Sequence, residues 1–238
     1  MNSPSPARWL PAPLRRFILH FESAIEDELI RFSGALPQHA RVLDAGAGEG
    51  QYAHHFTRHR YTGIDLGIGD AAWNYAGLDC VGNLEQLPFP DGQFDACLNI
   101  VTLEHVMDPP RVLKELGRVL KPGGELLLVA PHEWEEHQTP HDYWRFTRYG
   151  LRLLLQRAGF AHVEVEPVGG FFRLLARRLA HAPRMLPAPL ALLMLLAVVV
   201  PVFVLPLLDA FDRRRNFTLG FICRARKAGP HASDTAAA

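Results

Sequence analysis

Cysteine is scarce in this sequence, and none of it is arranged for a disulfide framework or a metal. The 238 residues include three cysteines, Cys80, Cys97 and Cys223, which are widely separated and fall in stretches expected to form strands. Isolated cysteines in apolar stretches behave as small buried side chains. A disulfide-rich secreted scaffold is therefore excluded, and we expect three free thiols in a reducing compartment.

A signal-peptide pattern at the start of the printed sequence and a net charge are also lacking. Residues 1–13 contain no continuous apolar run of signal-peptide length, so we expect the main folded part to be cytoplasmic. The 25 basic and 25 acidic residues cancel, but residues 21–170 carry 12 basic against 22 acidic side chains, whereas residues 171–227 carry ten against two. Residues 1–20 add three arginines and no acid. The acidic body is not expected to bind nucleic acid, and the basic flanks are the parts expected to meet an anionic surface.

The most informative stretch that is present runs from Val42 to Gly50 and reads VLDAGAGEG. Two apolar residues end a buried strand, an acid follows, and three glycines alternate through a tight turn. Glycines at such a turn bring backbone N–H groups, and no Cβ atoms, against a ligand. A dinucleotide fingerprint, G-x-G-x-x-G, carries its acid about twenty residues further on, whereas the pattern here is D-x-G-x-G-x-G. Asp44 is therefore expected to face a cation, such as the amino group of an amino-acid-like ligand.

A second acid supports a ligand at this turn. Residues 61–65 are expected to form the second strand, which ends at Asp65, 21 residues after Asp44. A carboxylate that closes the second strand is suited to a bidentate hold on vicinal ribose hydroxyls. A glycine-rich turn without a ligand is the alternative, and the agreement of the two signals argues against it.

Three further segments complete a family pattern. Residues 82–89 read GNLEQLPF, residues 94–106 read FDACLNIVTLEHV, and a helix expected from Asp108 to Leu120 leads into KPGG. Together with the glycine turn, these segments resemble the class I S-adenosylmethionine-dependent methyltransferases, and in particular the methyltransferase type 11 branch. The resemblance covers residues 41–131 continuously.

The fold that this resemblance implies is α/β. We expect a Rossmann-like methyltransferase sheet of seven strands, mostly parallel with the last strand antiparallel, and helices on both faces. A helix is expected after the glycine turn over residues 51–57, and the third strand over residues 78–81. The expected organisation is an N-terminal amphipathic helix (residues 1–37), a cofactor-binding core (38–168), an apolar helical insertion (169–216), the last strand (217–227) and a disordered tail (228–238).

The N-terminal helix is predicted from apolar residues that recur every three or four positions between residues 10 and 32. We expect it to pack over the edge of the sheet. A membrane-surface helix is the alternative, because Trp9, Arg15 and Arg16 lie at its start.

The resemblance also implies S-adenosyl-L-methionine as the cofactor. Asp65 would hold its ribose, and Leu66 would lie against its adenine. Asn83 stands where the family usually has Asp, and an Asn side chain can still donate to or accept from an adenine edge. The expected cofactor-binding residues are Asp44, Gly46, Gly48, Gly50, Asp65, Leu66, Asn83, Leu84 and Asn99.

A long loop of aromatic and titratable residues follows the fifth strand, over residues 131–147. A loop over the cofactor end of a sheet is a natural place to hold a substrate. A metal bound by His132, His137 and His141 is one alternative, but no helix fixes these residues on one face, and no metal is expected. The segment PHDYWRFT resembles a substrate loop of methyltransferases from cell-surface polysaccharide and lipid clusters. We therefore expect a lid that contacts the substrate.

Methyl transfer asks the protein mainly to align the acceptor and exclude water. A base is needed only when the acceptor is a hydroxyl that must lose its proton. The candidate bases are His105 and His141, and Asp142 could orient His141. O-methylation is the expected reaction. A non-catalytic protein of the same fold that binds a partner or lipid, and a nicotinamide-linked dehydrogenase, are the alternatives.

No charged residue occurs between Met185 and Leu208. As one helix this stretch would be about 35 Å long, enough to cross a bilayer. The resemblance argues against a crossing, because the last strand must return to the same sheet, and Pro201 and Pro206 interrupt the helix. We expect a kinked hairpin in peripheral contact with a membrane, anchored by flanking arginines. These arginines are Arg177, Arg178 and Arg184 on one side and Arg213, Arg214 and Arg215 on the other.

A homodimer interface or an extra core layer is the alternative for this insertion. The membrane interpretation points to an amphiphilic or lipid-linked methyl acceptor. It also points to a cytoplasmic protein that lies peripherally on the inner face of the cell membrane.

Overall fold

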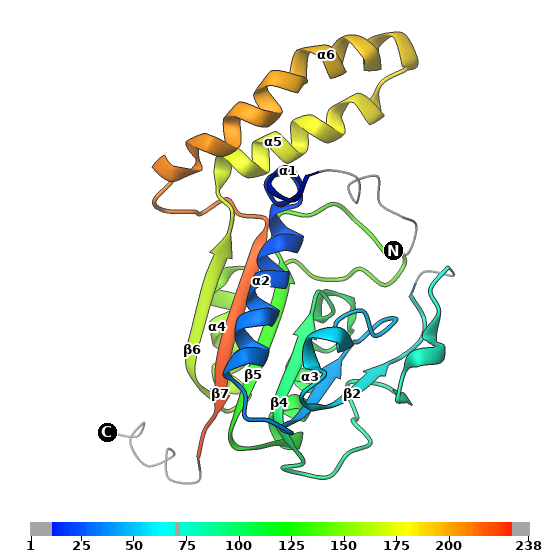
Figure 1. The fold of residues 1–238 in the computed structure, drawn as a ribbon, viewed down its shortest axis with the longest axis vertical. Coiled ribbons are helices and arrows are strands. Elements are labelled where there is room, and N and C mark those ends of the chain that lie inside the picture. Colours follow the sequence, from blue (N-terminus) through cyan, green and yellow to red (C-terminus); the bar gives the residue numbers. More distant parts are fainter. Residues whose placement is uncertain (1–10, 70–71, 230–238) are drawn as a thin grey trace.

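The computed structural model describes residues 11–69 and 72–229, and a seven-stranded sheet forms its centre (Figure 1). The strand order is β3-β2-β1-β4-β5-β7-β6. Neighbouring strands pair in parallel from β3 to β5, and β7 pairs antiparallel with both β5 and β6. The expected α/β fold with an antiparallel last strand is confirmed. The strands are β1 (Arg41–Ala45), β2 (Arg60–Asp65), β3 (Cys80–Val81), β4 (Phe94–Ile100), β5 (Leu120–Pro131), β6 (Phe160–Val168) and β7 (Gly220–Lys227).

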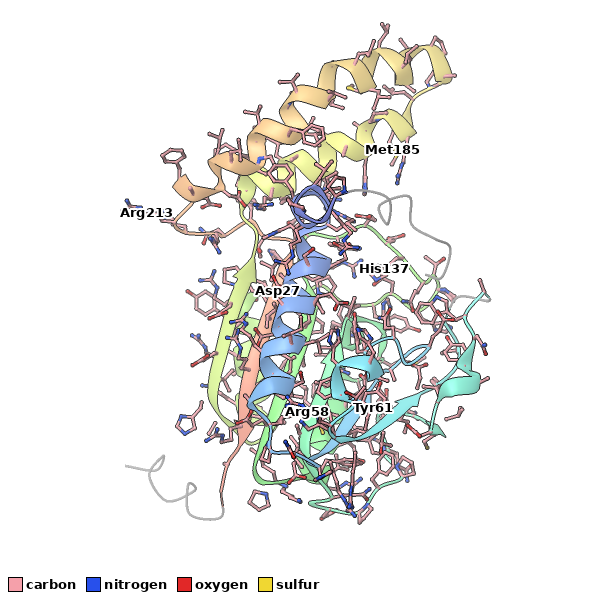
Figure 2. The ribbon with its side chains drawn as sticks, in the orientation of Figure 1. Asp27, Arg58, Tyr61, His137, Met185 and Arg213 are labelled. Carbon is pink, nitrogen blue, oxygen red and sulfur yellow. The ribbon has the colours of Figure 1, made fainter. Side chains whose placement is uncertain are left out.

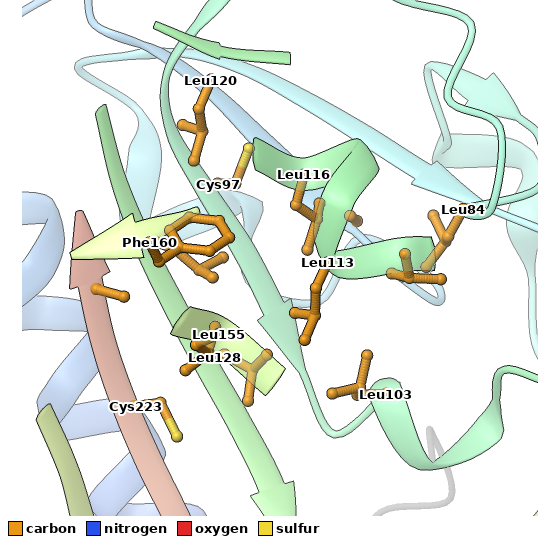
Figure 3. Close-up of a cluster of buried hydrophobic side chains, with 14 of the residues drawn as sticks. Leu84, Cys97, Leu103, Leu113, Leu116, Leu120, Leu128, Leu155, Phe160 and Cys223 are labelled. Atoms are coloured by element: carbon orange, nitrogen blue, oxygen red, sulfur yellow. The ribbon is translucent and has the colours of Figure 1, made fainter. Parts of the chain in front are cut away.

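Helices cover both faces of the sheet and enclose two hydrophobic clusters. On one face, α3 (Pro109–Val119) and α4 (Arg148–Arg157) pack their leucines onto β5 and β6, as Figure 3 shows around Leu116, Leu128 and Leu155. On the other face, α2 (His20–Ala35) lies along the sheet (Figure 1). The apolar side chains of the central strands β1, β4 and β5 are thereby removed from water, which is the main favourable contribution to folding.

The two helices on the first face begin where the sequence provides caps. Asp108 accepts a hydrogen bond from the backbone of Arg111 at 3.1 Å, and Pro109 is the first helical residue of α3. Thr147 caps α4 by accepting from the backbone of Gly150 at 3.1 Å. The buried positions of α3 follow the helical period that an amphipathic helix requires: Val112, Leu113, Leu116 and Val119.

The amphipathic stretch before the sheet forms two helices rather than the single one expected. α1 (Ala12–Ile18) ends at Leu19, whose backbone (φ −95°, ψ 54°) leaves the helical region before α2 begins. The bend brings Phe17 beside the insertion, where its ring lies 6.2 Å from that of Phe203. Trp9 lies outside the described residues. The side chains of α2 that pack on the sheet are Phe21, Ile25, Leu29 and Phe32.

Two expected elements are shorter in the structure. The helix after the glycine turn is a single 3₁₀ turn, η2 (Ala53–Phe56), because three glycines with positive φ occupy the start of the short connection to β2. The third strand is confined to Cys80–Val81, and its crossover contains only the 3₁₀ turn η3 (Tyr75–Gly77) among the described residues. This side of the sheet is therefore thinly covered.

The insertion between β6 and β7 is a helical hairpin that stands beyond the end of the sheet (Figure 1). α5 (Phe171–His181) leads outward through η5 (Ala182–Met185), and α6 (Ala188–Val204) returns through η6 (Leu205–Phe211). The segment Ala188–Phe211 is long and apolar enough to cross a membrane by length and composition, and an 18-residue stretch within it has a mean hydropathy of 2.9. Figure 2 shows Met185 at the outer turn and Arg213 at the returning end.

Both ends of this hairpin are tied to one point. Asp209 accepts hydrogen bonds from the backbones of Gly170, Phe172 and Arg173 at 2.9–3.1 Å, so it caps the start of α5 from the end of η6. Asp212 accepts from the backbone of Phe171 at 2.9 Å. The insertion thus leaves and re-enters the sheet at the same place, which agrees with a hairpin rather than a single crossing.

Candidate functional site

The glycine turn after β1 lies at the carboxyl ends of the parallel strands. Gly46, Gly48 and Gly50 have φ values of 92°, 54° and 77°, which residues other than glycine rarely adopt. A Cβ on Gly46 would lie 2.2 Å from Cγ2 of Thr102, whose hydroxyl donates to the Gly46 carbonyl at 3.2 Å. A Cβ on Gly50 would meet nothing within 4 Å in the described part of the chain. The turn therefore presents bare backbone to a ligand.

Asp44 and Asn99 lie beneath this turn and are fully buried. The Asp44 carboxylate accepts from the Tyr61 hydroxyl at 2.7 Å, and its other oxygen has no hydrogen-bond partner among residues 11–69 and 72–229. Burial raises the pKa of Asp44 to about 7, against the hydrogen bond from Tyr61. Asn99 donates to the Ala45 carbonyl at 2.8 Å, and so ties β4 to the end of β1.

Asp65 ends β2 beside the turn, as the spacing of the two acids predicted. Its carboxylate accepts from the backbone of Gly48 at 3.0 Å and from that of Gly67 at 2.8 Å. Each carboxylate oxygen has a second lone pair, so two further donors such as ribose hydroxyls can be accepted. The structure thus brings the second acid and the glycine turn into direct contact.

Apolar side chains border the turn on the β2 side. Leu66, expected at the adenine, is exposed, and so is Ile68. Trp73 lies over the turn: a Cβ on Gly48 would be 3.4 Å from its ring. Sequence reasoning missed Trp73, because it follows β2 in an irregular crossover where no period marks it. A flat ring beside exposed leucine and isoleucine forms a surface suited to an aromatic base.

The loop after β3 brings Asn83 and Leu84 to the same edge. The backbone of Gly82 donates to the Asp65 carbonyl at 2.9 Å, which fixes this loop beside β2. Asn83 is exposed, and its side-chain oxygen accepts from the backbone of Glu85 at 2.9 Å. Its NH₂ group can still donate to a ligand. Leu84 is buried in the core and contributes packing.

The lid, which we define as residues 132–147, crosses the site between the strand ends and the hairpin (Figures 1 and 2). Two backbone N–H groups of the lid, those of Tyr143 and Trp144, donate to the Glu104 carbonyl at 2.9 and 3.2 Å. Arg145 pairs with both oxygens of Asp142 at 2.6 and 2.7 Å. Burial alone would raise the pKa of Asp142, but its hydrogen bonds outweigh burial and lower the pKa to about 2.

The two candidate bases lie in different surroundings. His105, in the 3₁₀ turn η4 (Leu103–His105) after β4, donates through Nδ1 to the His141 carbonyl at 2.5 Å, and burial lowers its pKa. His141 directs its Nδ1 to the Tyr143 hydroxyl at 2.9 Å. The expected orienting acid, Asp142, instead bonds to Arg145 and to the backbone of His137.

The three histidines considered together as metal ligands do not converge. His132 bonds to the Phe146 carbonyl at 2.8 Å, and His141 faces Tyr143. His137 alone turns inward, to His105 and to the buried carboxyl group of Glu104. Burial raises the pKa of Glu104 to about 8. Glu104 was not among the residues that sequence reasoning selected.

Ion pairs join the lid to α5 of the hairpin. Arg177 lies 2.7 Å from Glu135 and stacks its guanidinium 3.7 Å from the centre of the Trp134 ring. Arg178 lies 3.5 Å from Glu133. Two of the six arginines expected to anchor the insertion on a membrane are thus engaged with the lid. Arg178 remains exposed beside its partner, and Arg184, Arg213, Arg214 and Arg215 are exposed as well.

The outer surface of the hairpin is apolar and exposed. Within α6 only Val198 is buried. The large side chains exposed by α6 and η6 are Leu190, Leu192, Leu193, Leu195, Leu196, Val199, Val200, Phe203, Val204, Leu207 and Phe211. Monomeric soluble proteins rarely expose so large a contiguous apolar patch, so this one marks an interaction surface.

Comparison with known proteins gives a match to the methyltransferase domain family of type 11 over residues 43–128. A malonyl-(acyl-carrier protein) O-methyltransferase of Erwinia pyrifoliae is 39% identical over 94 residues, which cover 37% of this chain and 36% of that protein. A fatty-acid O-methyltransferase of Mycolicibacterium smegmatis is 37% identical over 111 residues, which cover 40% of each chain. The chain thus spans less than half the length of these two relatives.

Solved structures share the fold at low sequence identity. The cyclase SpnF superposes with a TM-score of 0.55 and 24% identity over 85% of this chain and 81% of its own. Phosphoethanolamine N-methyltransferase 2 of Haemonchus contortus, solved with S-adenosyl-L-methionine, gives a TM-score of 0.56 and 17% identity over 88% of this chain and 53% of that one. The superpositions extend the likeness of the fold beyond residues 43–128 to most of the chain.

Proposed function

The chain carries a class I methyltransferase domain of the type 11 branch, and from that premise we propose an O-methyltransferase that acts at a membrane surface. The proposed reaction moves the methyl group of S-adenosylmethionine to an oxygen of an amphiphilic or lipid-linked acceptor. The proposed location is cytoplasmic and peripheral, on the inner face of the cell membrane.

S-adenosylmethionine is the cofactor of this family, and the residues at the glycine turn fit it. The turn offers bare backbone, Asp65 offers lone pairs at the end of β2, and Asp44 keeps one buried oxygen without a partner in the described residues. When bound, the cofactor supplies a methyl group on a sulfonium that is already a good leaving group. The chain itself has to orient the two reactants and exclude water, and the lid lies where it can do both.

One observation carries the choice of acceptor and location: the hairpin exposes an apolar helix on its outer side and is ion-paired to the lid through Arg177 and Arg178. An apolar face covered by lipid would place the lid, and the site beneath it, at the bilayer surface. Names of relatives add support, since one acts on a fatty acid and another on a malonyl group carried by a protein.

Two alternatives follow from particular observations. A second copy of this chain could cover the apolar face of α6, which would make a homodimer. The cyclase SpnF, which is not named as a methyltransferase, shares this fold, so the fold alone does not establish methyl transfer. The second alternative is therefore a non-catalytic protein that binds a partner or a lipid.

To test this proposal, the purified chain is incubated with vesicles made from a total lipid extract and with S-adenosylmethionine that carries a label in its methyl group. We expect label in the organic phase, identified by mass spectrometry as a methyl ether or ester. Asp65→Ala is the control that should lower it strongly when S-adenosylmethionine is limiting. Binding of S-adenosylhomocysteine without transfer to any lipid fraction would favour the non-catalytic alternative.

A further inference from the structure

Three side chains from two distant segments converge beside the glycine turn. Glu104 and His105 come from η4, after β4, and His137 comes from the lid. One oxygen of Glu104 lies 3.7 Å from Nε2 of His105 and 3.8 Å from Nε2 of His137. One ligating atom from each residue lies within 4.8 Å of the other two.

Hydrogen bonds on the far side of each ring fix which nitrogen carries a lone pair. Nδ1 of His105 donates to the His141 carbonyl at 2.5 Å, and Nδ1 of His137 donates to the Glu135 carbonyl at 3.1 Å. In neutral histidine the other ring nitrogen, Nε2, then carries the lone pair. The Nε2 lone pairs of His105 and His137 can therefore both bind a ligand or ion placed beside Glu104.

The polar atoms that these three side chains turn toward one another have no hydrogen-bond partner among the residues described. Both Glu104 oxygens and the Nε2 atoms of His105 and His137 are buried without a hydrogen bond. Glu104 itself is completely buried, and distances of 3.7 and 3.8 Å are too long for direct hydrogen bonds. Buried polar atoms that face one another without hydrogen bonds are costly, and a cation held between them would give each of them a partner.

A second group of similar composition behaves differently. Glu26, His54 and His55 also cluster, but His55 lies 2.7 Å from Glu26 and is directly hydrogen-bonded to it. Glu26 and His54 are exposed to water. That cluster has no unpaired buried oxygen, so it lacks the feature that marks the Glu104 cluster as a metal site.

We propose that Glu104, His105 and His137 bind a divalent first-row transition metal ion, with Zn²⁺ as the reference ion. Two imidazoles and one carboxylate form a ligand set that such ions use in three-ligand sites, where the fourth position stays open. Around a tetrahedral ion the ligand atoms stand about 3.3–3.5 Å apart, so the pairs at 3.7 and 3.8 Å need only a small contraction.

The carbonyl groups of His141 and Glu135, which accept from the two Nδ1–H groups, supply the outer contacts that such a site needs, and Asp142 adds a negative charge behind the rings. Its carboxylate lies 3.3 Å from Nδ1 of His137 and 4.0 Å from Nδ1 of His105, and Arg145 holds it in place. Carboxylates behind metal-bound histidines orient the rings and raise their basicity. The open position would take an oxygen of the methyl acceptor, and this role, unlike metal binding, rests on the function proposed above.

The test uses the full chain without cofactor or acceptor. After removal of metal with a chelator, Co²⁺ is added as a spectroscopic probe and Zn²⁺ as its competitor. We expect one equivalent of Co²⁺ with the intense visible absorption of a four-coordinate site, displaced by Zn²⁺. Glu104→Gln and His137→Gln are each expected to weaken binding by at least about 100-fold, because loss of a ligand exceeds the 10–100-fold effect of an outer contact.

Two matched variants control for adventitious binding. His141→Gln changes a histidine of the same lid, and His54→Gln changes one of the other cluster, and both are expected to bind Co²⁺ like the wild type. Their melting temperatures without metal, and those of the two ligand variants, report folding. If Glu104→Gln does not fold, His137→Gln decides, because it changes only the lid.

The proposal is overturned if the wild type binds no Co²⁺ at micromolar concentration, if His137→Gln binds as well as the wild type, or if His54→Gln removes the signal. These results do not depend on methyl transfer. Metal binding in a chain that transfers no methyl group would therefore refute the proposed function and leave the metal site standing.

Discussion

Asp65→Ala is expected to weaken binding of S-adenosylhomocysteine by about 1.5–3 kcal/mol, or roughly 10- to 150-fold in Kd. The structure supplies the reason, since the carboxylate ends β2 beside the glycine turn with lone pairs left for two ribose hydroxyls. Hydrogen bonds to a charged acceptor are about twice as strong as neutral ones. Isothermal titration calorimetry measures the loss directly.

The same substitution also removes the acceptor for two backbone N–H groups, those of Gly48 and Gly67. A fall in affinity could therefore reflect a disturbed turn rather than a lost ribose contact. Asp79→Ala provides the matched control, because Asp79 accepts from the backbone of Gly63 at 2.8 Å and lies outside the turn. Both variants are expected to melt earlier than the wild type, and only Asp65→Ala should lose affinity.

Two results would refute this reasoning. Unchanged affinity in Asp65→Ala would place the ribose elsewhere. An equal loss of affinity in Asp79→Ala would show that general loosening of β2, rather than the Asp65 carboxylate, sets the affinity.

Three other predictions concern the lid, the hairpin and Asp44. If His141 acts as the base, His141→Gln lowers kcat and leaves the affinity for S-adenosylhomocysteine unchanged; full activity in initial-rate assays would leave His141 a structural part of the lid. Replacing the exposed Arg213, Arg214 and Arg215 with Glu should release the chain from anionic vesicles in a flotation assay, more readily at higher salt, because each arginine contributes about 1 kcal/mol at such a surface. A wild type that never floats and sediments as a dimer would contradict that expectation. Because burial raises the pKa of Asp44 to about 7, its carboxyl group is protonated below that pH in the folded chain but ionised above about pH 4 in the unfolded one. The free energy of unfolding should therefore fall as the pH rises from 4 to 7, while affinity for the cationic cofactor should rise over the same range. Calorimetry across neutral pH checks this, and a flat affinity profile would contradict it.

The cofactor half of the site could be predicted from the sequence because its signals are local. The glycine turn and the acid that ends β2 lie within 22 residues, and each marks the end of a strand. Parallel strands bring their carboxyl ends to one edge, so Asp65 and Gly48 meet without any further information. Trp73 carried no such signal, since no strand or helix fixes its position.

The lid half depends on contacts between distant segments. The expectation of no metal considered His132, His137 and His141, which share one loop, whereas the structure groups His137 with Glu104 and His105 from another element. Nothing in the spacing of residues 104 and 137 predicts that approach. The pairing of Arg177 with Glu135 across 42 residues is equally non-local, and so arginines interpreted as membrane anchors proved to hold the lid.

The clamp at the base of the hairpin has a consequence for how such a protein can diversify. Val168 and Gly220 are paired neighbours in the antiparallel ladder, so the two attachment points lie one strand spacing apart, about 5 Å. A connection of a few residues could join them with no change to the sheet. The hairpin is therefore a replaceable module, and relatives could exchange one docking surface for another while they keep the glycine turn and the strand-end acids. The contacts that would have to change with it are few, and those between Arg177 and the lid are foremost among them.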